Sequence, residues 1–299
     1  LEKLNQQLIP EVRAGFNLGK SGAIYAAREQ FIYVLRRVAV AKDAKEHSDR
    51  NMKALAQGLR ALDEADDFTP HGDSIEAELD TMAISASHAT PVLHRPITPE
   101  MLTPHQASAE YARYAAKQLS EAMAEEEAGS MALYGLGKTF ARLEAQSKDT
   151  TAGLKCNVMY RAAALAHPEN YLAANELGVR LAKAGRYESA RKILQLAASQ
   201  PANATVFENL AAVEFKLGNV AQAEQIQRTG HQIAMRERMQ SEISRRHGVS
   251  WVSPNEFRST GPSQRTRGQA SSQNTVQPNS QTPANPNLTN PSPRSQQAG

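Results

Sequence analysis

Two short segments of the sequence come close to the phosphate-binding loop of nucleotide-binding proteins. They read AGFNLGKS at 14–21 and ALYGLGKT at 132–139, with Ala at the position of the loop's first Gly. A working loop follows a buried β-strand and opens a helix, so that free backbone N–H groups surround the phosphate. Neither segment follows a strand pattern. We therefore expect no nucleotide site and no cofactor, and calorimetry with millimolar ATP would overturn this expectation if it detected binding.

The histidine, cysteine and serine residues show no pattern typical of catalysis or metal binding. Four of the eight His (His71, His88, His94 and His105) lie in one proline-rich stretch, at spacings that match no standard ligand set. Cys156 is the only cysteine, which excludes an intramolecular disulfide and a Cys-rich metal site. The nucleophile motif Gly-x-Ser-x-Gly does not occur. The sequence therefore predicts a protein that is not an enzyme, with no catalytic residues and no metal site.

The charge of the chain is nearly balanced, and the small excess lies at one end. The 34 Lys and Arg against 31 Asp and Glu give a net charge of +3, and the residues after Trp251 carry four Arg and one Glu. An excess confined to a sparse tail is not typical of a nucleic-acid-binding protein. No run approaches the ~18 apolar residues of a membrane span. Because the chain begins with Leu1, we interpret it as processed or truncated; the sequence slightly favours a soluble protein of the cytoplasm and leaves export open.

Proline divides the chain into helical and irregular parts. Five of the 15 prolines lie within 70–104 and seven within 254–293. Proline interrupts helices, so the long stretches without it are free to be helical. The final stretch is rich in Pro, Asn, Gln and Ser and has almost no large apolar residues, which predicts disorder. The expected organisation is an N-terminal helical region at 1–68, a Pro-rich connector at 69–104, a helical block at 105–252 and a disordered tail at 253–299.

Apolar periodicity predicts helices on both sides of the connector. Apolar residues at spacings of three and four predict a helix over 48–66, and the run 107–127 is rich in good helix formers and is followed by Gly129. Within the connector we expect one turn of helix around 74–83. No alternating strand pattern occurs in the sequence. The predicted fold class is all-α.

A pattern of small and large residues recurs in the second helical block. The pattern occurs in three units, and the second and third follow each other at an interval of 33 residues. The first unit has about seven extra residues around 144–153, which we expect to lengthen its turn. Small residues allow two helices to approach closely, while the larger ones fill the space between them. The recurring residues are Leu136, Gly137, Tyr160, Ala163 and Pro168 in the first unit, Leu177, Gly178, Gly185, Ala190 and Pro201 in the second, and Leu210, Ala211, Gly218 and Ala223 in the third.

This pattern resembles the tetratricopeptide repeat (TPR), whose unit is about 34 residues long. The resemblance covers three units over about 130–236 and implies an α-solenoid of antiparallel helix pairs. Ala174 and Glu214 depart from the large aromatic residues that the family often has there. A fainter copy at 8–41 is either a divergent TPR-like hairpin or an unrelated helical hairpin. After the third unit we expect a capping helix that continues to His247.

The resemblance implies a binding groove lined by the first helix of each unit. TPR-like proteins typically bind a partner segment there, and recurring lysines predict a ligand that is acidic or ends in a carboxylate. The sequence does not reproduce the full carboxylate clamp of chaperone-binding TPR domains. The candidate groove residues are Tyr134, Lys138, Arg142, Asn175, Val179, Lys183, Glu208, Asn209, Ala212 and Lys216.

The leading functional hypothesis is a non-enzymatic scaffold or adaptor that binds another protein or peptide. One alternative is an accessory domain of a larger enzyme or secretion-system assembly. Another is a weak nucleic-acid binder that uses the basic C-terminal helix, in which Arg236, Arg238, Arg245 and Arg246 cluster. The simpler explanation of that cluster, without nucleic-acid binding, is a solvated helix end whose positive charges complement the helix dipole.

Overall fold

The computed structural model describes residues 2–69, 79–93, 102–147, 150–201 and 203–247, except for side chains at a few segment ends. The chain divides into two units, Leu1–His247 and Gly248–Gly299, and all described residues belong to the first. The predicted disordered tail at 253–299 and parts of the connector, including His71 and His94, lie outside the described residues.

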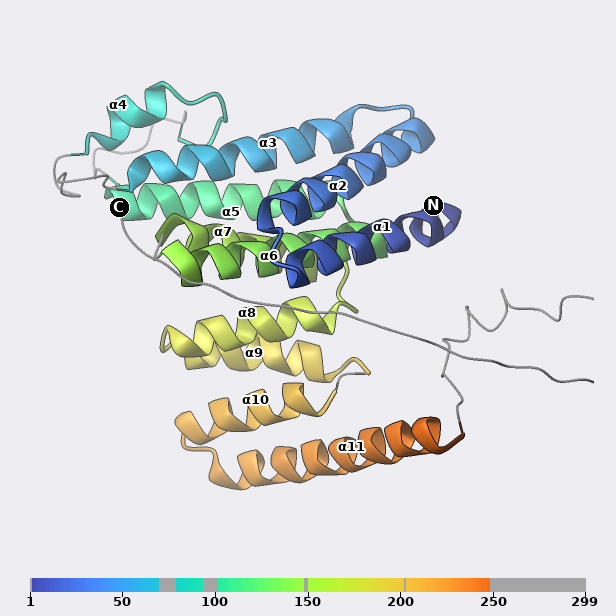
Figure 1. Cartoon of the computed structure of the whole chain (residues 1–299). Helices are drawn as coiled ribbons and strands as arrows, with labels where there is room; N and C mark the ends of the chain where they lie inside the picture. The colour runs from blue at the N-terminus through green and yellow to red at the C-terminus, as the bar shows by residue number, and fades with distance from the viewer. Residues whose placement is uncertain (1, 70–78, 94–101, 148–149, 202, 248–299) are drawn as a thin grey trace, which may run out of the picture. The chain divides into compact units, whose positions relative to one another are not determined.

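The described part of the chain is helical and contains no β-strand, which confirms the all-α prediction for these residues (Figure 1). The expected helix over 48–66 and the continuous helix to His247 are both present. The elements are α1 (Glu2–Lys20), α2 (Ile24–Glu46), α3 (Arg50–Glu64), the 3₁₀ helix η1 (Ala65–Phe68), α4 (Thr81–Ala86), α5 (Pro104–Ala122), α6 (Glu127–Ser147), α7 (Thr150–Ala166), α8 (Tyr171–Lys183), α9 (Tyr187–Ala198), α10 (Ala204–Lys216) and α11 (Val220–His247).

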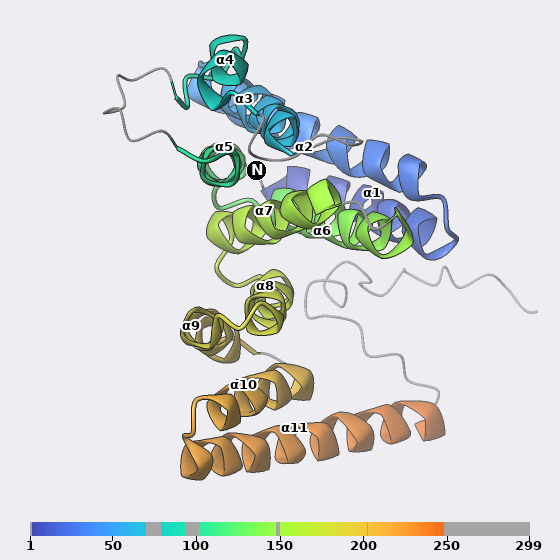
Figure 2. The ribbon, with the colours of Figure 1, turned by 90° about the vertical axis from the view of Figure 1, so that its left-hand side faces the viewer.

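The helices pack as adjacent pairs. α1 packs on α2, α3 on α5, α6 on α7, α8 on α9 and α10 on α11. Successive pairs then contact each other, with α7 against α8 and α9 against α10, as Figure 2 shows. Apolar residues that recur on one face of each helix explain this arrangement, because each pair must cover its apolar face with the next.

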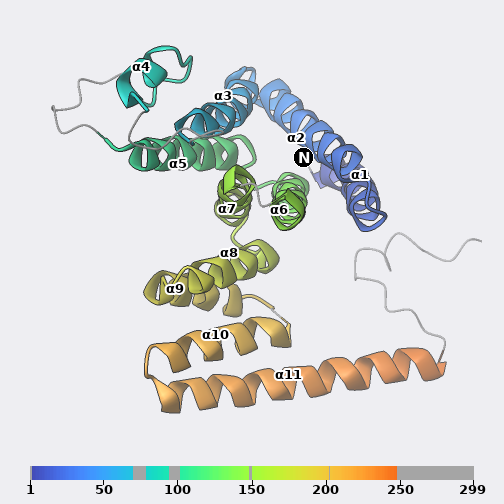
Figure 3. The same cartoon turned by 60° about the vertical axis from the view of Figure 1, so that its left-hand side comes forward.

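The helices before and after the connector share one core. α1 and α2 pack on α6, and α5 packs on both α3 and α7 (Figure 3). A single cluster of buried apolar residues extends from Leu8 in α1 to Val206 in α10. The connector therefore separates two regions of the sequence. Because it links α3 to α5, which pack on each other, it does not separate two cores.

Residues 79–93 of the connector are fixed by a buried histidine. His88 is hydrogen-bonded to the Tyr111 hydroxyl at 2.8 Å and to the Asp67 carboxylate at 3.0 Å. Its ring meets Phe68 edge-on, with centroids 5.4 Å apart. The Glu64 carboxylate accepts a hydrogen bond from the backbone N–H of Ala89 at 2.8 Å. These contacts tie the connector to η1 and α5. The short helix of the connector, α4, lies at Thr81–Ala86 and begins after Asp80, so it overlaps only the end of the turn expected around 74–83, of which residues 74–78 lie outside the described residues.

Three of the helix pairs share the same glycine turn. Gly22, Gly185 and Gly218 have φ values of 87°, 74° and 81°, in the left-handed region that favours glycine. In each turn the next residue's N–H donates to the carbonyl five residues earlier, at 3.0, 2.9 and 2.9 Å. This is the Schellman arrangement that ends a helix. The turn between α1 and α2 thus has the same geometry as those between α8 and α9 and between α10 and α11.

Glycines in the first helix of three pairs allow a large side chain of the second helix to approach. A Cβ on Gly15 would lie 2.7 Å from the Phe31 ring, and one on Gly178 would lie 2.5 Å from Leu194. Both contacts span 16 residues. In the α6–α7 pair the same kind of contact joins Gly137 and the ring of Tyr160, and it spans 23 residues. The difference equals the seven extra residues of this unit.

The extra residues lengthen helices, not the turn as we expected. Glu144 lies inside α6 and Gly153 inside α7, with only residues 148–149 between these helices undescribed. The reason is that 141–146 consists almost entirely of good helix formers. Arg180 of α8 fixes the two extended ends, since it binds the Glu144 carboxylate at 2.7 and 3.0 Å and the Gly153 carbonyl at 3.2 Å.

The predicted helix 107–127 was also wrong at its end. α5 stops at Ala122, and Glu125 adopts a φ of 66° before α6 begins. Gly129 does not end a helix but lies inside α6, where a Cβ would meet the Met123 sulfur at 2.7 Å. Met123 packs into the space that this glycine leaves, at the point where the chain passes from α5 to α6.

Candidate binding sites between helix pairs

The ten predicted groove residues lie on α6, α8 and α10, and the structure groups most of them around two cavities. Three of them line a cavity between α1 and α6, and five line another between α8 and α10. Asn175 lies beside the second group, because it accepts a hydrogen bond from Asn209 at 2.9 Å. Glu208 is exposed and lines neither cavity. The first group is Tyr134, Lys138 and Arg142, and the second is Val179, Lys183, Asn209, Ala212 and Lys216.

The α8–α10 cavity is a small apolar groove with a basic edge. Its volume is about 250 Å³, and Tyr187, Leu194 and Val213 form its apolar surface. Lys183 and Lys216 are exposed at its edge, and no acidic residue lines it. Within the described residues neither lysine forms an ion pair. The groove therefore presents apolar surface next to two positive charges that are available to a ligand.

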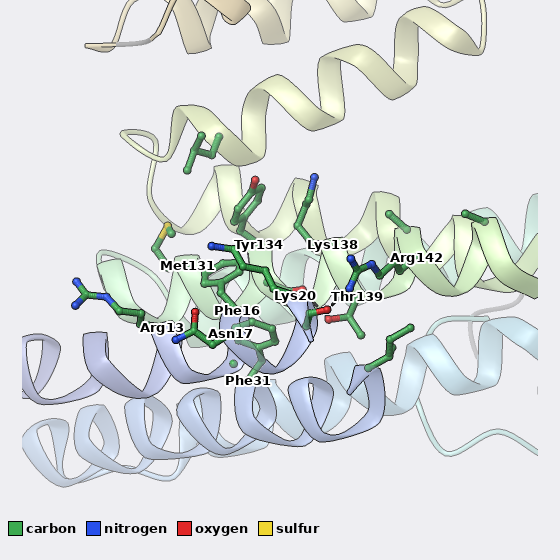
Figure 4. A pocket seen from close by; sticks show the side chains of 17 residues that line it. Arg13, Phe16, Asn17, Lys20, Phe31, Met131, Tyr134, Lys138, Thr139 and Arg142 are labelled. Carbon is green, nitrogen blue, oxygen red and sulfur yellow. Dashed lines mark hydrogen bonds between the residues drawn. The ribbon is translucent and has the colours of Figure 1, made fainter. Parts of the chain in front are cut away.

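The α1–α6 cavity is larger and contains a group of aromatic rings. Its volume is about 740 Å³, with Phe16, Phe31 and Tyr134 gathered between the two helices in Figure 4. The Phe16 ring lies edge-on to Phe31 with centroids 5.1 Å apart, and 5.9 Å from the Tyr134 ring. Gly135 makes room for this arrangement, because a Cβ at this position would collide with the Phe31 ring. Two glycines, Gly15 and Gly135, thus bring α1 and α6 onto the same phenyl ring.

Four basic side chains surround these rings: Arg13, Lys20, Lys138 and Arg142. Lys138 pairs with Glu176 of α8 at 3.0 Å, and Arg142 donates to the Gly19 carbonyl at the end of α1. Burial, together with the charge of Glu176, raises the pKa of Tyr134 to about 12, so its hydroxyl remains neutral and able to donate.

Both segments that come close to a phosphate-binding loop lie in helices beside this cavity. Residues 14–21 lie in α1 and its final turn, and 132–139 lie inside α6. Neither opens a helix, so the geometry that such a loop requires is not found at either segment. Phe16 and Lys20 of the first segment nevertheless face the same cavity as Tyr134 and Lys138 of the second.

Sequence reasoning missed the part of this cavity that α1 contributes. Arg13, Phe16 and Lys20 were not among the expected groove residues, because α1 and α6 are more than 100 residues apart in the sequence. The one available signal was the similarity of the segments 14–21 and 132–139, in which an aromatic residue precedes Gly-Lys by three positions.

The other candidate groups for chemistry lie apart from the cavities. Burial raises the pKa of the Cys156 thiol to about 11, which leaves the reactive thiolate scarce near neutrality. His88 is hydrogen-bonded to Tyr111 and fixes the connector, and His105 lies exposed in the first turn of α5. Within the described ranges, no group of three His, Cys, Asp or Glu is placed to hold a metal ion.

The basic C-terminal helix is largely exposed. Arg236 and Arg238 lie on the surface of α11, whereas the side chains of Arg245 and Arg246 lie outside the described residues. None of the helices in the described residues is long and apolar enough to cross a membrane.

Comparison with known proteins gives no further identification: no protein-family model, no curated protein and no solved structure matches the chain.

Proposed function

We propose that this protein is a TPR-like, non-enzymatic scaffold that binds a partner segment in a groove formed by the first helices of successive pairs. The glycine turns at Gly22, Gly185 and Gly218 support the proposal, as do the close contacts of Gly15, Gly137 and Gly178. Since the α1–α2 pair shares both features with the α8–α9 pair, we include it as a divergent fourth unit. In this proposal α11 is the capping helix, and residues 253–299 are a disordered tether.

One observation carries the functional part of the proposal: a basic residue recurs at the same place in the first helix of each of the four proposed units. Lys20, Arg142, Lys183 and Lys216 each follow the small residue of their first helix by five positions. All four are exposed, and two lie at each cavity. Long basic side chains repeated along stacked helices favour an extended ligand with negative charge at matching intervals.

The α8–α10 groove is the best candidate for the main contact with such a segment. Its volume of about 250 Å³ suits one side chain of a peptide, and it holds five of the ten expected residues. The half-buried Asn209 amide, which also donates to Asn175, lies beside Lys183 and Lys216, and together these groups can bind a peptide carboxylate. We therefore expect an acidic or C-terminal carboxylate to lie between the two lysines.

The proposal is tested with peptides selected on the full chain from a random library displayed with free C-termini. We expect acidic sequences to be enriched, and the Lys183→Glu/Lys216→Glu variant to bind the selected peptides at least about tenfold more weakly in fluorescence anisotropy, because two attractive contacts become repulsive. Amidation of the peptide C-terminus shows whether a terminal carboxylate contributes.

A matched variant, Lys45→Glu/Lys53→Glu, reverses two charges on α2 and α3 away from both cavities. It should retain binding. If the groove variant binds the peptides as tightly as the wild type does, the proposed groove is wrong. Loss of binding in both variants would show that only overall charge matters.

A further inference from the structure

The α1–α6 cavity differs from the α8–α10 groove in size and in the character of its lining. Its volume of about 740 Å³ falls within the range of ~300–1,000 Å³ that is typical of small-molecule sites, whereas the groove at about 250 Å³ lies below it. The cavity also extends under Leu172 of α8, so three helix pairs contribute to its walls. A space of this size accepts a whole organic molecule and not only one side chain.

The lining of the cavity combines aromatic surface with positive charge. Phe16, Phe31 and Tyr134 supply ring faces and edges that pack well against a planar or acyl group. The described lining contains four basic residues and no acidic one. Glu176 of α8 pairs with Lys138 at 3.0 Å, which still leaves three basic residues of the lining without an acidic partner among the described residues.

Two of the cations are available to a ligand without breaking an ion pair. Arg13 and Lys20 are exposed and have no ion-pair partner in the described part of the chain. In Figure 4 Arg13 lies at one end of the aromatic group and Arg142 at the other. An anion that enters the cavity therefore meets a charge on either side of the rings.

We propose that the α1–α6 cavity is a separate binding site for a small amphipathic organic anion. An aromatic or acyl group packs on Phe16, Phe31 and Tyr134, and a carboxylate, sulfonate or phosphate pairs with Arg13 and Lys20. Segment 14–21 thus contributes Phe16 and Lys20 to the site and segment 132–139 contributes Tyr134, without the backbone cradle of a phosphate-binding loop. This site does not depend on the peptide groove between α8 and α10.

The test compares two fluorescent probes that share their ring system. The first, 8-anilinonaphthalene-1-sulfonate, carries a negative charge, and the second, N-phenyl-1-naphthylamine, is neutral. We expect the anionic probe to bind the full wild-type chain at one site and the Arg13→Gln/Lys20→Gln variant about fivefold more weakly or worse. The neutral probe should bind both proteins equally, because the rings are unchanged.

The control is Lys183→Gln/Lys216→Gln, which removes the same charge from the other groove. It should bind the anionic probe as the wild type does while losing affinity for the selected peptides. Equal far-UV circular dichroism and equal denaturation midpoints exclude probe binding to a loosened core. The proposal is overturned by absent binding of the anionic probe, by equal affinity in the Arg13/Lys20 variant, or by equal weakening in the control.

Discussion

We expect replacement of Phe31 with alanine to lower the free energy of unfolding by about 3–5 kcal/mol, which is the usual cost of removing a fully buried phenyl ring. The Phe31 side chain is 1% exposed, and Gly15 of α1 and Gly135 of α6 both approach its ring too closely to carry a Cβ. Neither helix can fill the space by a small shift, because each is fixed by its own pair. The change should therefore loosen the N-terminal pair from α6.

The measurement is urea denaturation followed by far-UV circular dichroism, with Tyr33→Ala as the matched control. Tyr33 is an aromatic residue of the same helix, but it is 43% exposed and contacts Arg37 on the surface. Its removal should change the free energy of unfolding by less than about 1 kcal/mol. Equal effects of the two substitutions would contradict the packing described between α1, α2 and α6.

We expect replacement of Asp43 with alanine to lower the free energy of unfolding by about 2–3 kcal/mol at neutral pH, because two backbone N–H groups at the start of α3 would lose a charged acceptor. Asp43 lies near the end of α2 and accepts hydrogen bonds from the N–H groups of Asn51 and Met52, both at 2.8 Å. It also accepts from the Asn51 amide at 2.9 Å and the Ser48 hydroxyl at 3.2 Å.

The effect should depend on pH in a defined direction. Burial raises the pKa of Asp43, but the hydrogen bonds from Met52, Asn51 and Ser48 outweigh it and leave the pKa below its usual value. A lowered pKa in the folded state gives stability that is present above the unfolded-state value of about 3.9 and is lost as the pH falls further. The difference between wild type and Asp43→Ala should thus be full at neutral pH and shrink below about pH 4.

Asp49→Ala is the control for this prediction. Asp49 directly precedes α3, but its side chain makes no capping hydrogen bond and only pairs with Lys53 on the surface at 2.7 Å. Its replacement should cost less than about 1 kcal/mol and show little dependence on pH near 4. A larger effect at Asp49 than at Asp43 would contradict the assignment of the cap.

The contrast between Asp43 and Asp49 shows why local sequence rules predict helices better than their contacts. The position of α3 follows from its own apolar spacing, and the turn at Gly22 follows from glycine's access to positive φ. The side chain that caps α3 is Asp43 of α2, which lies six residues before Asp49, the position that capping rules assign. Such a contact depends on how α2 and α3 pack, which no local pattern contains.

The same distinction applies to the binding sites. The repeat register placed Lys183 and Lys216 on equivalent helices, and the structure places both at one groove. The aromatic cavity could not be predicted in this way, since it needs Phe16 of α1 to meet Tyr134 of α6, and the whole α3–α5 pair separates these residues in the sequence. Long-range packing of this kind is decided by the complete set of helix faces and not by any one segment.

The central claim, that a partner segment lies in the α8–α10 groove, is tested most directly by proximity labelling with a selected peptide that carries a chloroacetyl group. Cys156 is buried and has a raised pKa, so the wild-type chain should react little. A single new thiol is introduced by Ala212→Cys in the groove, or by Ala221→Cys, which is also exposed and lies on α11. The groove account predicts alkylation by the peptide at least about tenfold faster in the Ala212→Cys variant, with equal rates for free iodoacetamide. Equal rates of peptide alkylation in the two variants would contradict it.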